Sequence, residues 1–393
     1  MSWQSVPLGE VFEIARGGSP RPIDKFITDD PDGLNWVKIG DATASGKYIL
    51  STKEKIRKEG LSKTRAVEPG DFLLTNSMSF GRPYIMGTHG CIHDGWLVLK
   101  PRRDDTVSQD YMYHVLGSDE IKARFASRAP GSTVKNLNSA MVAETSIPLP
   151  PLEEQRRIAG ILDAADALRR RRREALALLD TLPGAIFAEM FLSSRPGDPE
   201  RPTQPLGDLV NAVSGSTPSK SNKAFWNGDI PWISPKDMKT DDLDRAILNI
   251  TQEATKTGKA KLVGPDVTLI VIRGMILAHS VPVCDLRVPA SFNQDVKALV
   301  PRKGISNIFI SAALRASKNR LLSMVSNAAH GTKRIEMGDL MKFPIPFATE
   351  AEQEIFVDAI AAVAAQRARF EGASHDGETL FASLQSRAFA GEL

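Results

Sequence analysis

One feature constrains the fold of this chain more than any other: its sequence repeats itself at a distance of about 198 residues. Leu8-Gly9-Glu10-Val11 returns as Leu206-Gly207-Asp208-Leu209, and Glu154-Gln155 returns as Glu352-Gln353. Further pairs follow in the same order: Gly17-Gly18-Ser19-Pro20 with Gly215-Ser216-Thr217-Pro218, Trp36-Val37 with Trp232-Ile233, Gly131-Ser132 with Gly331-Thr332, and Ile147-Pro148 with Ile345-Pro346. This period is too long for a solenoid, so the sequence predicts a tandem duplication of a domain with a connector.

The first part of each copy has the pattern of a mixed α+β domain. Phe72–Thr75 follows the turn Pro69-Gly70-Asp71, and both this run and Trp96–Leu99 are typical of strands. The second copy has similar runs at Val267–Ile272 and Val296–Val300, and helical stretches are expected at 109–126 and 308–328. The predicted fold class is therefore α+β, with two similar mixed α/β domains that each contain a curved sheet. We name them head one (1–150) and head two (205–348).

Each head is followed by a long helical stretch: arm one (151–193), a linker (194–204) before head two, and arm two (349–393). Apolar positions alternate steps of three and four, which is typical of a coiled-coil seam. The predicted seam of arm one is Ile158, Ile161, Ala165, Leu168, Arg172, Ala175, Leu179, Leu182 and Ile186. That of arm two is Phe356, Ala359, Val363, Gln366, Phe370, Ala373, Gly377, Leu380 and Leu384. An arm of ~40 residues would span roughly 60 Å.

The alternation of head and arm predicts a closed arrangement, in which the two arms pair antiparallel as a coiled coil with internal pseudo-two-fold symmetry. The basic run Arg169–Arg173 would then meet the acidic residues Glu371, Asp376 and Glu378 of arm two. Pro183-Gly184 is expected to kink or break arm one, because proline lacks the amide proton of a helix interior. Gly372 and Gly377 predict a local irregularity in arm two.

Composition and charge indicate the environment and the kind of partner to be expected. We expect no membrane span, because no apolar run of about 18 residues is apparent. The N-terminus has no signal-peptide pattern, and the two cysteines fall in different heads, so a cytoplasmic protein is expected. Arm one is neutral and arm two carries −5, which leaves +8 on the heads and the linker between them. A basic excess in the heads favours contact with phosphates.

The sequence lacks motifs of nucleotide-dependent enzymes. It contains neither a phosphate-binding loop nor the Asp/Asn-Pro-Pro-aromatic tetrad of adenine methyltransferases. His89, Cys91 and His93 could share one face of a strand, but a fourth metal ligand is not evident and head two lacks these histidines. We therefore predict no metal and no catalytic residue; an alternative is that His93-Asp94 lies near DNA in head one alone.

Polar loops and cationic side chains of both heads are the predicted DNA-binding positions. The Gly-rich loops at 17–21 and 215–220 and the loops at 131–136 and 331–334 offer amides, hydroxyls and cations for phosphates, whereas Arg, Lys and Asn can also read bases. In head one the candidates are Arg16, Gly18, Ser19, Arg21, Arg57, Lys63, Arg65, Asn76, Arg82, Ser132, Thr133 and Lys135. In head two they are Ser216, Thr217, Lys220, Lys236, Lys256, Lys259, Lys261, Arg273, Thr332, Lys333 and Arg334.

These features together resemble the specificity subunit of a type I restriction–modification system. The motifs that carry the resemblance are Trp3…Leu8-Gly9-Glu10, Trp36…Asp41, Pro69-Gly70-Asp71, Gly131-Ser132…Asn136-Leu137, Ile147-Pro148-Leu149-Pro150-Pro151-Leu152-Glu153-Glu154-Gln155 and the ending Phe389-Ala390-Gly391-Glu392-Leu393. Before arm two the proline-rich string is reduced to Pro346-Phe347-Ala348-Thr349.

The resemblance implies a non-catalytic subunit with two target recognition domains, each of which reads one half of a split site in double-stranded DNA. The arms would set the spacer. Two methyltransferase subunits, which would bind S-adenosylmethionine and methylate adenine N6, would dock on this subunit, and restriction/translocase subunits would join them. The subunit itself would hold no cofactor. Two alternatives stay open: a nuclease that uses His89, Cys91 and His93, and a scaffold whose arms bind only proteins.

Overall fold

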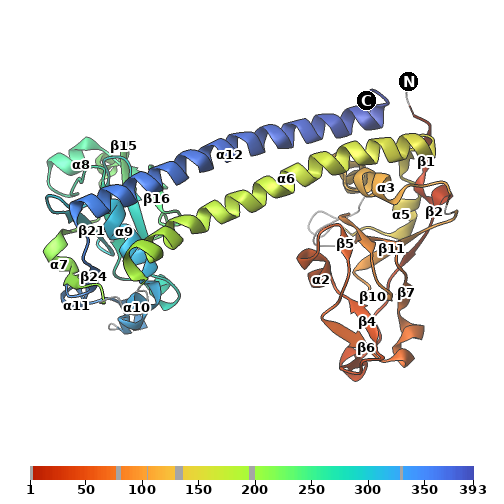
Figure 1. Cartoon of the computed structure of the whole chain (residues 1–393), viewed down its shortest axis with the longest axis horizontal. Coiled ribbons are helices and arrows are strands. Elements are labelled where there is room, and N and C mark those ends of the chain that lie inside the picture. Colours follow the sequence, from red (N-terminus) through yellow and green to blue (C-terminus); the bar gives the residue numbers. More distant parts are fainter. Residues whose placement is uncertain (1–2, 77–80, 104, 129–135, 194–199, 328–330) are drawn as a thin grey trace. The chain divides into compact units, whose positions relative to one another are not determined.

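The computed structural model describes residues 3–76, 81–103, 105–128, 136–193, 200–327 and 331–393. The chain divides into two compact units, and both arms run from one unit into the other. Unit 1 contains residues 1–173 and 372–393, and unit 2 contains residues 174–371. Each unit therefore holds one head together with part of each arm (Figure 1). The heads are confirmed as mixed α/β domains.

Head one is built on two five-stranded sheets. The first sheet has the order β2 (Phe12–Arg16), β11 (Trp96–Pro101), β8 (Phe72–Thr75), β9 (Pro83–Met86), β5 (Tyr48–Ile49). The second has the order β3 (Ile27–Thr28), β6 (Glu54–Ile56), β4 (Leu34–Val37), β10 (Gly90–Ile92), β7 (Arg65–Val67). Its helices are α1 (Leu8–Val11), α2 (Ile39–Ala44), α3 (Gln109–Leu116), α4 (Asp119–Arg128) and α5 (Ser139–Ala143), with 3-10 turns η1 (Ile23–Lys25) and η2 (Lys58–Lys63).

Head two repeats the first of these sheets strand for strand. Its order is β14 (Val210–Ser214), β21 (Val296–Pro301), β18 (Val267–Val271), β19 (Val283–Leu286), β16 (Asp242–Leu243), and the edge strand is parallel to its neighbour in both heads. A three-stranded sheet has the order β17 (Leu248–Ile250), β15 (Trp226–Ile233), β20 (Ser291–Phe292), and β22 (Ser326–Asn327) pairs with β23 (Lys333–Arg334). The other elements are α7 (Leu206–Leu209), η4 (Lys223–Phe225), α8 (Gln252–Lys256), η5 (Met275–Ala278), α9 (Asn307–Ala316), α10 (Lys318–Ser323) and α11 (Met337–Met341).

A short strand pair closes each head at the point where its arm begins. In head one β1 (Ser5–Pro7) pairs antiparallel with β12 (Ser146–Pro148), and in head two β13 (Thr203–Pro205) pairs with β24 (Pro344–Pro346). The first and last segments of each head thus lie side by side. This explains why the Ile-Pro pairs recur at the same distance as the arm motifs: each is the last strand before a long helix.

The arms are the helices α6 (Leu152–Phe187) and α12 (Glu350–Ala390). A capping box starts α12, because Glu352 Oε2 accepts from the Thr349 amide at 2.8 Å and Thr349 Oγ1 accepts from the Glu352 amide at 3.3 Å. Neither a break at Pro183 in arm one nor the irregularity predicted at Gly372 and Gly377 in arm two is found: α6 runs through Pro183 and ends in a π-helical turn, η3 (Ala188–Leu192), and α12 runs through both glycines. A kink at Pro183 stays a prediction. Neighbouring turns hold these helices despite the residues that weaken them.

One buried glutamine joins each arm to its head. Gln155 Oε1 accepts from the Ser108 amide at 2.9 Å, and its Nε2 donates to the Pro150 and Thr106 carbonyls at 2.8 and 3.1 Å. Gln353 Oε1 makes the same bond to the Ser306 amide at 2.9 Å. Because each glutamine satisfies the amide at the start of the helix that follows β11 or β21, it fixes the first turn of the arm against the head.

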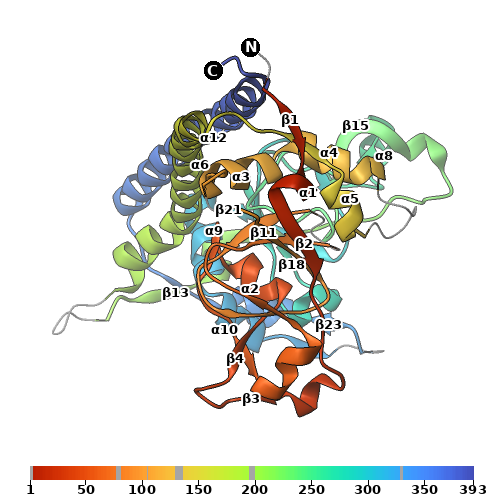
Figure 2. The same cartoon turned by 90° about the vertical axis from the view of Figure 1, so that its right-hand side faces the viewer.

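The core of each head extends into both arms. Ile158, Ala159 and Leu162 of α6 and Ala388 and Phe389 of α12 join the core of head one. Figure 2 shows the start of α6 and the end of α12 side by side next to α3. In unit 2 Phe187 and Phe191, at the end of α6, pack on Phe309 of the head and Phe356 at the start of α12. Within each unit the two arms therefore run antiparallel, as predicted.

The predicted seam is correct at its two ends and wrong nearer the middle. Ile158 and Phe356 are fully buried, Ile161, Ala165, Leu179, Val363 and Phe370 are partly buried, but Leu168 and Leu380 are 53% and 58% exposed. The predicted seam positions Arg172 and Ala373 do meet, since Arg172 donates to the Ala373 carbonyl at 2.7 Å. Beside them Arg169, which lies outside the predicted seam, has its guanidinium 4.2 Å from the centre of the Phe381 ring. Large cationic side chains fill the contact, so the leucines turn outward.

The predicted charge pairing is confirmed for one acidic residue of arm two. Glu378 forms ion pairs with Arg169 and Arg173, all within unit 1. Glu371 instead pairs with Arg367 one turn before it on the same helix, and Arg367 also reaches Asp180 of α6 in unit 2. Gly377 has a specific role, because a Cβ at this position would lie 2.5 Å from Arg172 Nη1. The glycine makes room for the arginine.

The expectation about membrane-like segments needs a correction. Among the described residues, one helix, Leu152–Leu192, is long enough and apolar enough to cross a membrane, judged by length and composition alone. The mean hydropathy of its most apolar stretch is 1.6. In the structure this helix carries Arg169–Arg173, and its end packs Phe187 and Phe191 into the core of head two. Only 11% of that most apolar stretch is buried, so most of it lies at the surface of the helix.

Replacing Gln155 by leucine should lower the free energy of unfolding of unit 1 by about 1–3 kcal/mol, because the Ser108 amide and two carbonyls lose their buried partner. Gln353→Leu should act similarly in unit 2. Urea denaturation measures both losses. The matched control is Gln366→Leu, at an exposed position of α12, which should change stability by less than about 0.5 kcal/mol. Equal effects of all three variants would contradict the role of the buried glutamines.

Candidate nucleic-acid interface

In head one the predicted DNA-binding residues gather around the turn His93-Asp94-Gly95, between β10 and β11. Asn76 Nδ2 and Arg16 Nε donate to the Asp94 carbonyl at 2.7 and 3.0 Å. Ser19 Oγ donates to the Asp94 carboxylate at 2.7 Å, and the Arg21 guanidinium lies 3.8 Å from it. Arg65 Nε donates to the Arg16 carbonyl at 3.0 Å. Loops distant in sequence thus form one surface, which we name the Asp94 surface: Arg16, Ser19, Arg21, Arg65 and Asp94. Asn76, which is only 3% exposed, supports the turn from within the head.

The Asp94 carboxylate orders this surface. The hydrogen bond from Ser19 holds the pKa of Asp94 below its ordinary value of 3.8, with further help from Arg21. The group is therefore ionised at neutral pH, and it orients the hydroxyl and the guanidinium near it. The alternative that His93-Asp94 lies near DNA in head one alone stays a prediction.

The backbone amides of Gly17 and Gly18 in the 17–21 loop bind to other parts of head one. The Gly17 amide donates to the Trp96 carbonyl at 2.9 Å and the Gly18 amide to the Ile92 carbonyl at 3.2 Å, so neither amide is available to a phosphate. The Gly18 amide thus has a partner within head one, and the contact of Gly18 with DNA stays a prediction. A Cβ on Gly17 would lie 2.2 Å from the His93 carbonyl oxygen. Glycine is needed because the loop passes directly over the turn.

A cavity of about 1110 Å³ lies beside the Asp94 surface. Ser19, Arg21 and His93 belong to its lining, together with Trp36 and the ion pair between Lys38 and Glu54. His93 has a structural role here, since its ring packs near Trp36 and Trp96 and its Nδ1 accepts from the Gly95 amide at 2.8 Å. Among the residues that the structure describes, no group of three or more His, Cys, Asp or Glu side chains is placed to hold a metal ion.

Head two builds the equivalent turn from Asn293-Gln294-Asp295. Thr217 Oγ1 donates to Gln294 Oε1 at 2.6 Å, which repeats the bond from Ser19 to Asp94 with a neutral acceptor. Ser216 Oγ donates to the Lys259 carbonyl at 2.9 Å, and this bond brings the 259–261 loop to the 215–220 loop. The same framework thus carries different side chains at the position that organises the surface.

A cluster of cations continues the surface of head two, and we name it the 273 cluster: Lys261, Arg273, Lys297, Lys333 and Arg334. Burial, followed by the charges of Arg273 and Lys261, lowers the pKa of Lys297, which shows that three of these cations lie near one another. Arg273 and Arg334 face each other across an antiparallel bridge, and the Gly274 amide donates to the Lys333 carbonyl at 3.0 Å. Such a concentration of positive charge suits a polyanion.

The remaining candidates are more scattered. Lys63 lies over the Phe26 ring and Arg82 over the Tyr84 ring, at 5.1 and 5.2 Å, and Arg57 precedes η2. Lys220, Lys236 and Lys256 are exposed on two loops and at the end of α8, and Thr332 precedes β23. Ser132, Thr133 and Lys135 lie outside the described residues. All of these candidates stay predictions.

Sequence reasoning missed two residues of head two. Lys297 was hidden within Val296–Val300, a run typical of a buried strand, in which Leu299 is buried as well as Val296 and Ala298. Gln294 has no motif, but its alignment with Asp94 follows from the repeat.

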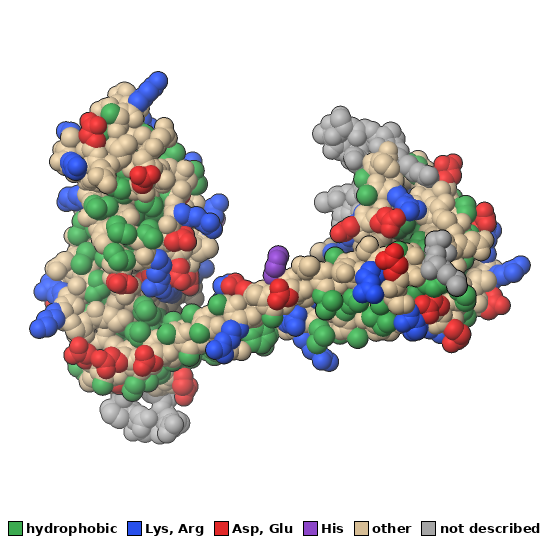
Figure 3. All heavy atoms as spheres, turned by 90° about the horizontal axis from the view of Figure 1, so that it is seen from above, with side chains coloured by type: hydrophobic (Ala, Val, Ile, Leu, Met, Phe, Trp, Pro, Cys, Tyr) green, Lys and Arg blue, Asp and Glu red, His purple; other side chains and the backbone are tan. Residues whose placement is uncertain are grey.

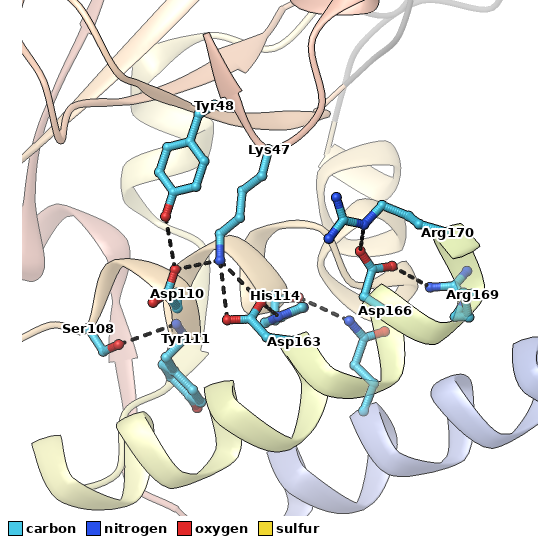
Figure 4. Close-up of polar contacts among 11 residues, drawn as sticks. Lys47, Tyr48, Ser108, Asp110, Tyr111, His114, Asp163, Asp166, Arg169 and Arg170 are labelled. Carbon is cyan, nitrogen blue, oxygen red and sulfur yellow. Dashed lines mark hydrogen bonds and ion pairs between the residues drawn. The ribbon is translucent and has the colours of Figure 1, made fainter. Parts of the chain in front are cut away.

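A polar cluster positions head one on arm one (Figure 4). Lys47, just before β5, points between Asp110 of α3 and Asp163 of α6, forming an ion pair with the first and lying 3.1 Å from the second. His114 Nε2 lies 2.8 Å from the same Asp163 carboxylate, and Tyr48 donates to Asp110 at 3.2 Å. We name these five residues the head–arm cluster. It controls how the Asp94 surface is held on the helix.

Burial and charge act in opposite directions within the head–arm cluster. Burial favours the neutral forms, but the bonds and charges of Asp110 and Asp163 outweigh it at Lys47, whose pKa lies above its ordinary value of 10.5. At His114 burial is the stronger effect, so its pKa lies below the ordinary 6.5 despite Asp163. The neutral imidazole then donates from Nε2 to Asp163 at neutral pH.

With the fold and the two surfaces described, comparison with known proteins decides the family. The family model for the type I restriction modification DNA specificity domain matches residues 1–177 and again residues 202–371. The chain belongs to this family. Each match contains one head and the beginning of the arm that follows it, so the duplication corresponds to two copies of the family's domain.

Curated relatives agree with this assignment. The chain is 34% identical over 173 residues to the EcoR124I/EcoR124II type I restriction enzyme specificity subunit of Escherichia coli, and 24% identical over 258 residues to the MjaIX specificity subunit of Methanocaldococcus jannaschii. These matches span 44% and 60% of this chain, and 42% and 58% of those relatives. The chain thus matches about half the length of the curated relatives.

Two solved structures share the fold over nearly the whole chain. A chain from a structure on complex assembly and conformational transition of the type I R-M system is 20% identical with a TM-score of 0.66, and covers 100% of this chain and 98% of its own length. The type I restriction–modification S subunit of M. genitalium is 14% identical with a TM-score of 0.55, with coverages of 99% and 96%.

The head–arm cluster predicts a pH dependence of stability. The unfolded state gains a proton at His114 near pH 6.5, whereas the folded state resists it to lower pH, so the free energy of unfolding should fall as the pH drops below about 6.5. The loss for one such group is at most about 1.4 kcal/mol per pH unit. His114→Gln, which can still donate to Asp163, should reduce this loss between pH 7.5 and 5.5 in urea denaturation. His375→Gln on the exposed surface of α12 is the control, and an unchanged pH dependence in His114→Gln would contradict the assignment.

Proposed function

We propose that this chain is the non-catalytic DNA-specificity subunit of a type I restriction–modification complex. Each head would contact one half of a split target in double-stranded DNA. The observation that carries this proposal is the pair of matched surfaces, one in each head, that gather hydroxyl groups and cations around equivalent turns. Phosphate contacts would set the position of each head, and the divergent side chains would read the bases.

The two turns support different readings by the two heads. Head one presents an ionised carboxylate, Asp94, which can accept from an exocyclic amino group of cytosine, whereas the amide of Gln294 in head two can both donate and accept, as in bidentate recognition of adenine. Two unlike half-sites are the simplest consequence. The scaffold repeats while the chemistry at its centre changes.

The arms would set the spacer and dock the other subunits. Figure 3 shows hydrophobic side chains at the surface of the long helices, between acidic and basic ones. Leu168, Leu178, Leu182, Ile355 and Leu380 are all among the exposed large hydrophobic residues. Helices of two methyltransferase subunits could cover them, and S-adenosylmethionine and the adenine-N6 chemistry would belong to those subunits. Restriction subunits would join the same assembly.

Genome methylation mapping tests the proposal as a whole. A host that carries the system should show N6-methyladenine in a split motif, and deletion of this chain should abolish that pattern. Insertion of one heptad after Arg173 and one after Glu371 lengthens each arm by about 10.5 Å, which corresponds to about 3 base pairs. The spacer should lengthen by about that amount with both half-sites unchanged. A motif that persists after the deletion contradicts the proposal.

The salt dependence of DNA binding tests the 273 cluster separately. Arg273→Ala and Lys297→Ala should each weaken binding and reduce the slope of log K against log salt by about 1 if they contact phosphates. Lys303→Ala is a matched control, because Lys303 is exposed just beyond Pro301, at the opposite end of β21 from Lys297. The measurement is fluorescence anisotropy of a duplex with the mapped motif at several salt concentrations. Equal slopes for all variants would remove the 273 cluster from the interface.

A further inference from the structure

The loop between β18 and β19 exposes two large apolar side chains within the cationic surface of head two. Met275 and Ile276 are 64% and 41% exposed, and they follow Arg273 and Gly274 directly. An isolated exposed apolar residue is ordinary, because much of any protein surface is apolar. Two neighbouring ones beside five cations, on a short turn, call for a specific explanation.

The turn that carries them is held firmly. Gly274 has φ = +132°, a conformation that strains any residue with a side chain, and its amide donates to the Lys333 carbonyl at 3.0 Å. On the other side, the His279 and Ser280 amides both donate to the Ile276 carbonyl at 3.0 Å. Leu277 is buried in the core of head two and anchors η5 from below. Met275 and Ile276 therefore stay at the surface rather than folding inward.

The charges around these two side chains identify the kind of partner. The backbones of Arg273, Lys333 and Arg334 hold the base of the turn, and the Arg334 guanidinium is paired with Glu336. The charges of Arg273 and Lys261 act on Lys297. A partner that covers the apolar pair must also meet this positive charge. Duplex DNA offers both complements, because its phosphates pair with the cations and its stacked bases accept an apolar side chain between them.

We propose that Met275 and Ile276 form a wedge that enters the DNA at the half-site of head two and unstacks one base step. This inference rests on the proposed function, since it requires that head two binds DNA. Wedges of Met, Leu, Ile and Phe kink duplexes by partial unstacking, at a cost of a few kcal/mol per step that added protein contacts offset. Pyrimidine–purine steps deform most easily, so the wedge would add specificity through deformability, beyond direct base contacts.

The test uses the full chain assembled with the methyltransferase subunits of its own system, and duplexes with the mapped motif. 2-Aminopurine, whose fluorescence rises on unstacking, replaces one base at a time through the half-site of head two. The methylated adenine is left out, because a methyltransferase that extrudes it would also raise the signal. We expect a rise of several-fold at one or two adjacent positions with the wild-type chain.

The double variant Met275→Ala/Ile276→Ala should return that signal to the level of free DNA and weaken specific binding by about 10-fold. Both side chains are exposed, so the fold should persist, which the thermal melting temperature verifies. Ile247→Ala, a 71% exposed apolar residue on the loop between β16 and β17 of the same head, should keep the full signal.

Three results overturn the wedge, and they can be told apart. Specific binding without fluorescence change at any position in the wild type removes the wedge but leaves the proposed function intact. An unchanged signal in the double variant assigns the unstacking to other residues. If the double variant no longer co-purifies with the methyltransferase subunit but gives the same fluorescence signal as the wild type, Met275 and Ile276 form a protein-binding surface instead. Absence of all specific binding instead contradicts the proposed function itself.

Discussion

The arrangement of each unit depends on one buried hydrogen-bonding side chain at the start of the arm. Gln155 Oε1 and Gln353 Oε1 each accept from the amide of the serine that precedes the helix after β11 or β21. The Nε2 of each glutamine donates to a carbonyl just before its own arm, that of Pro150 or that of Ala348. A buried amide without a partner costs about 1–3 kcal/mol, so other orientations of the arm on the head are penalised. Because the closing strands β12 and β24 end only a few residues earlier, the direction of the arm follows from the fold of the head.

The repeat keeps this frame and changes the interior of the heads. Phe72 of β8 and Ile85 of β9 pair in head one, and the equivalent positions of head two hold Thr268 and Asp285. Asp285 is buried, and burial raises its pKa even though Arg315 lies 3.0 Å away and Ser311 donates at 2.7 Å. A buried ion pair needs such partners to persist. The same sheet thus accommodates an apolar pair in head one and a hydrogen-bonded polar group in head two, just as equivalent turns carry different side chains at the surface.

The sequence was informative where a structure depends on periodicity or on a repeat, and uninformative where it depends on which side chains meet across the fold. The offset of 198 residues predicts the two heads, the closing strands and the equivalence of Gln155 with Gln353, because local patterns survive duplication. The heptad pattern fails at Leu168 and Leu380, since apolarity alone cannot show that Arg169 covers Phe381 or that Gly377 admits Arg172. The head–arm cluster joins three segments more than 40 residues apart, and none of its members has a local motif.

The candidate interface shows the same limit and also its physical reason. Gly17 and Gly18 have the composition of a phosphate-binding loop, yet their amides are used by Trp96 and Ile92, because the loop must pass over the 93–95 turn. The side chain of the 17–21 loop that contacts the turn is Ser19, which orients Asp94. Its equivalent in the 215–220 loop of head two is Thr217, which orients Gln294. A negative charge in a basic surface weakens phosphate attraction but fixes the geometry of the groups around it. Head two has a neutral amide at this position, and its carboxylate, Asp295, lies one position later and accepts from Asn293 Nδ2 at 3.0 Å. The two heads therefore place their carboxylates differently around equivalent turns: Asp94 accepts from the loop before it, whereas Asp295 accepts from its own turn.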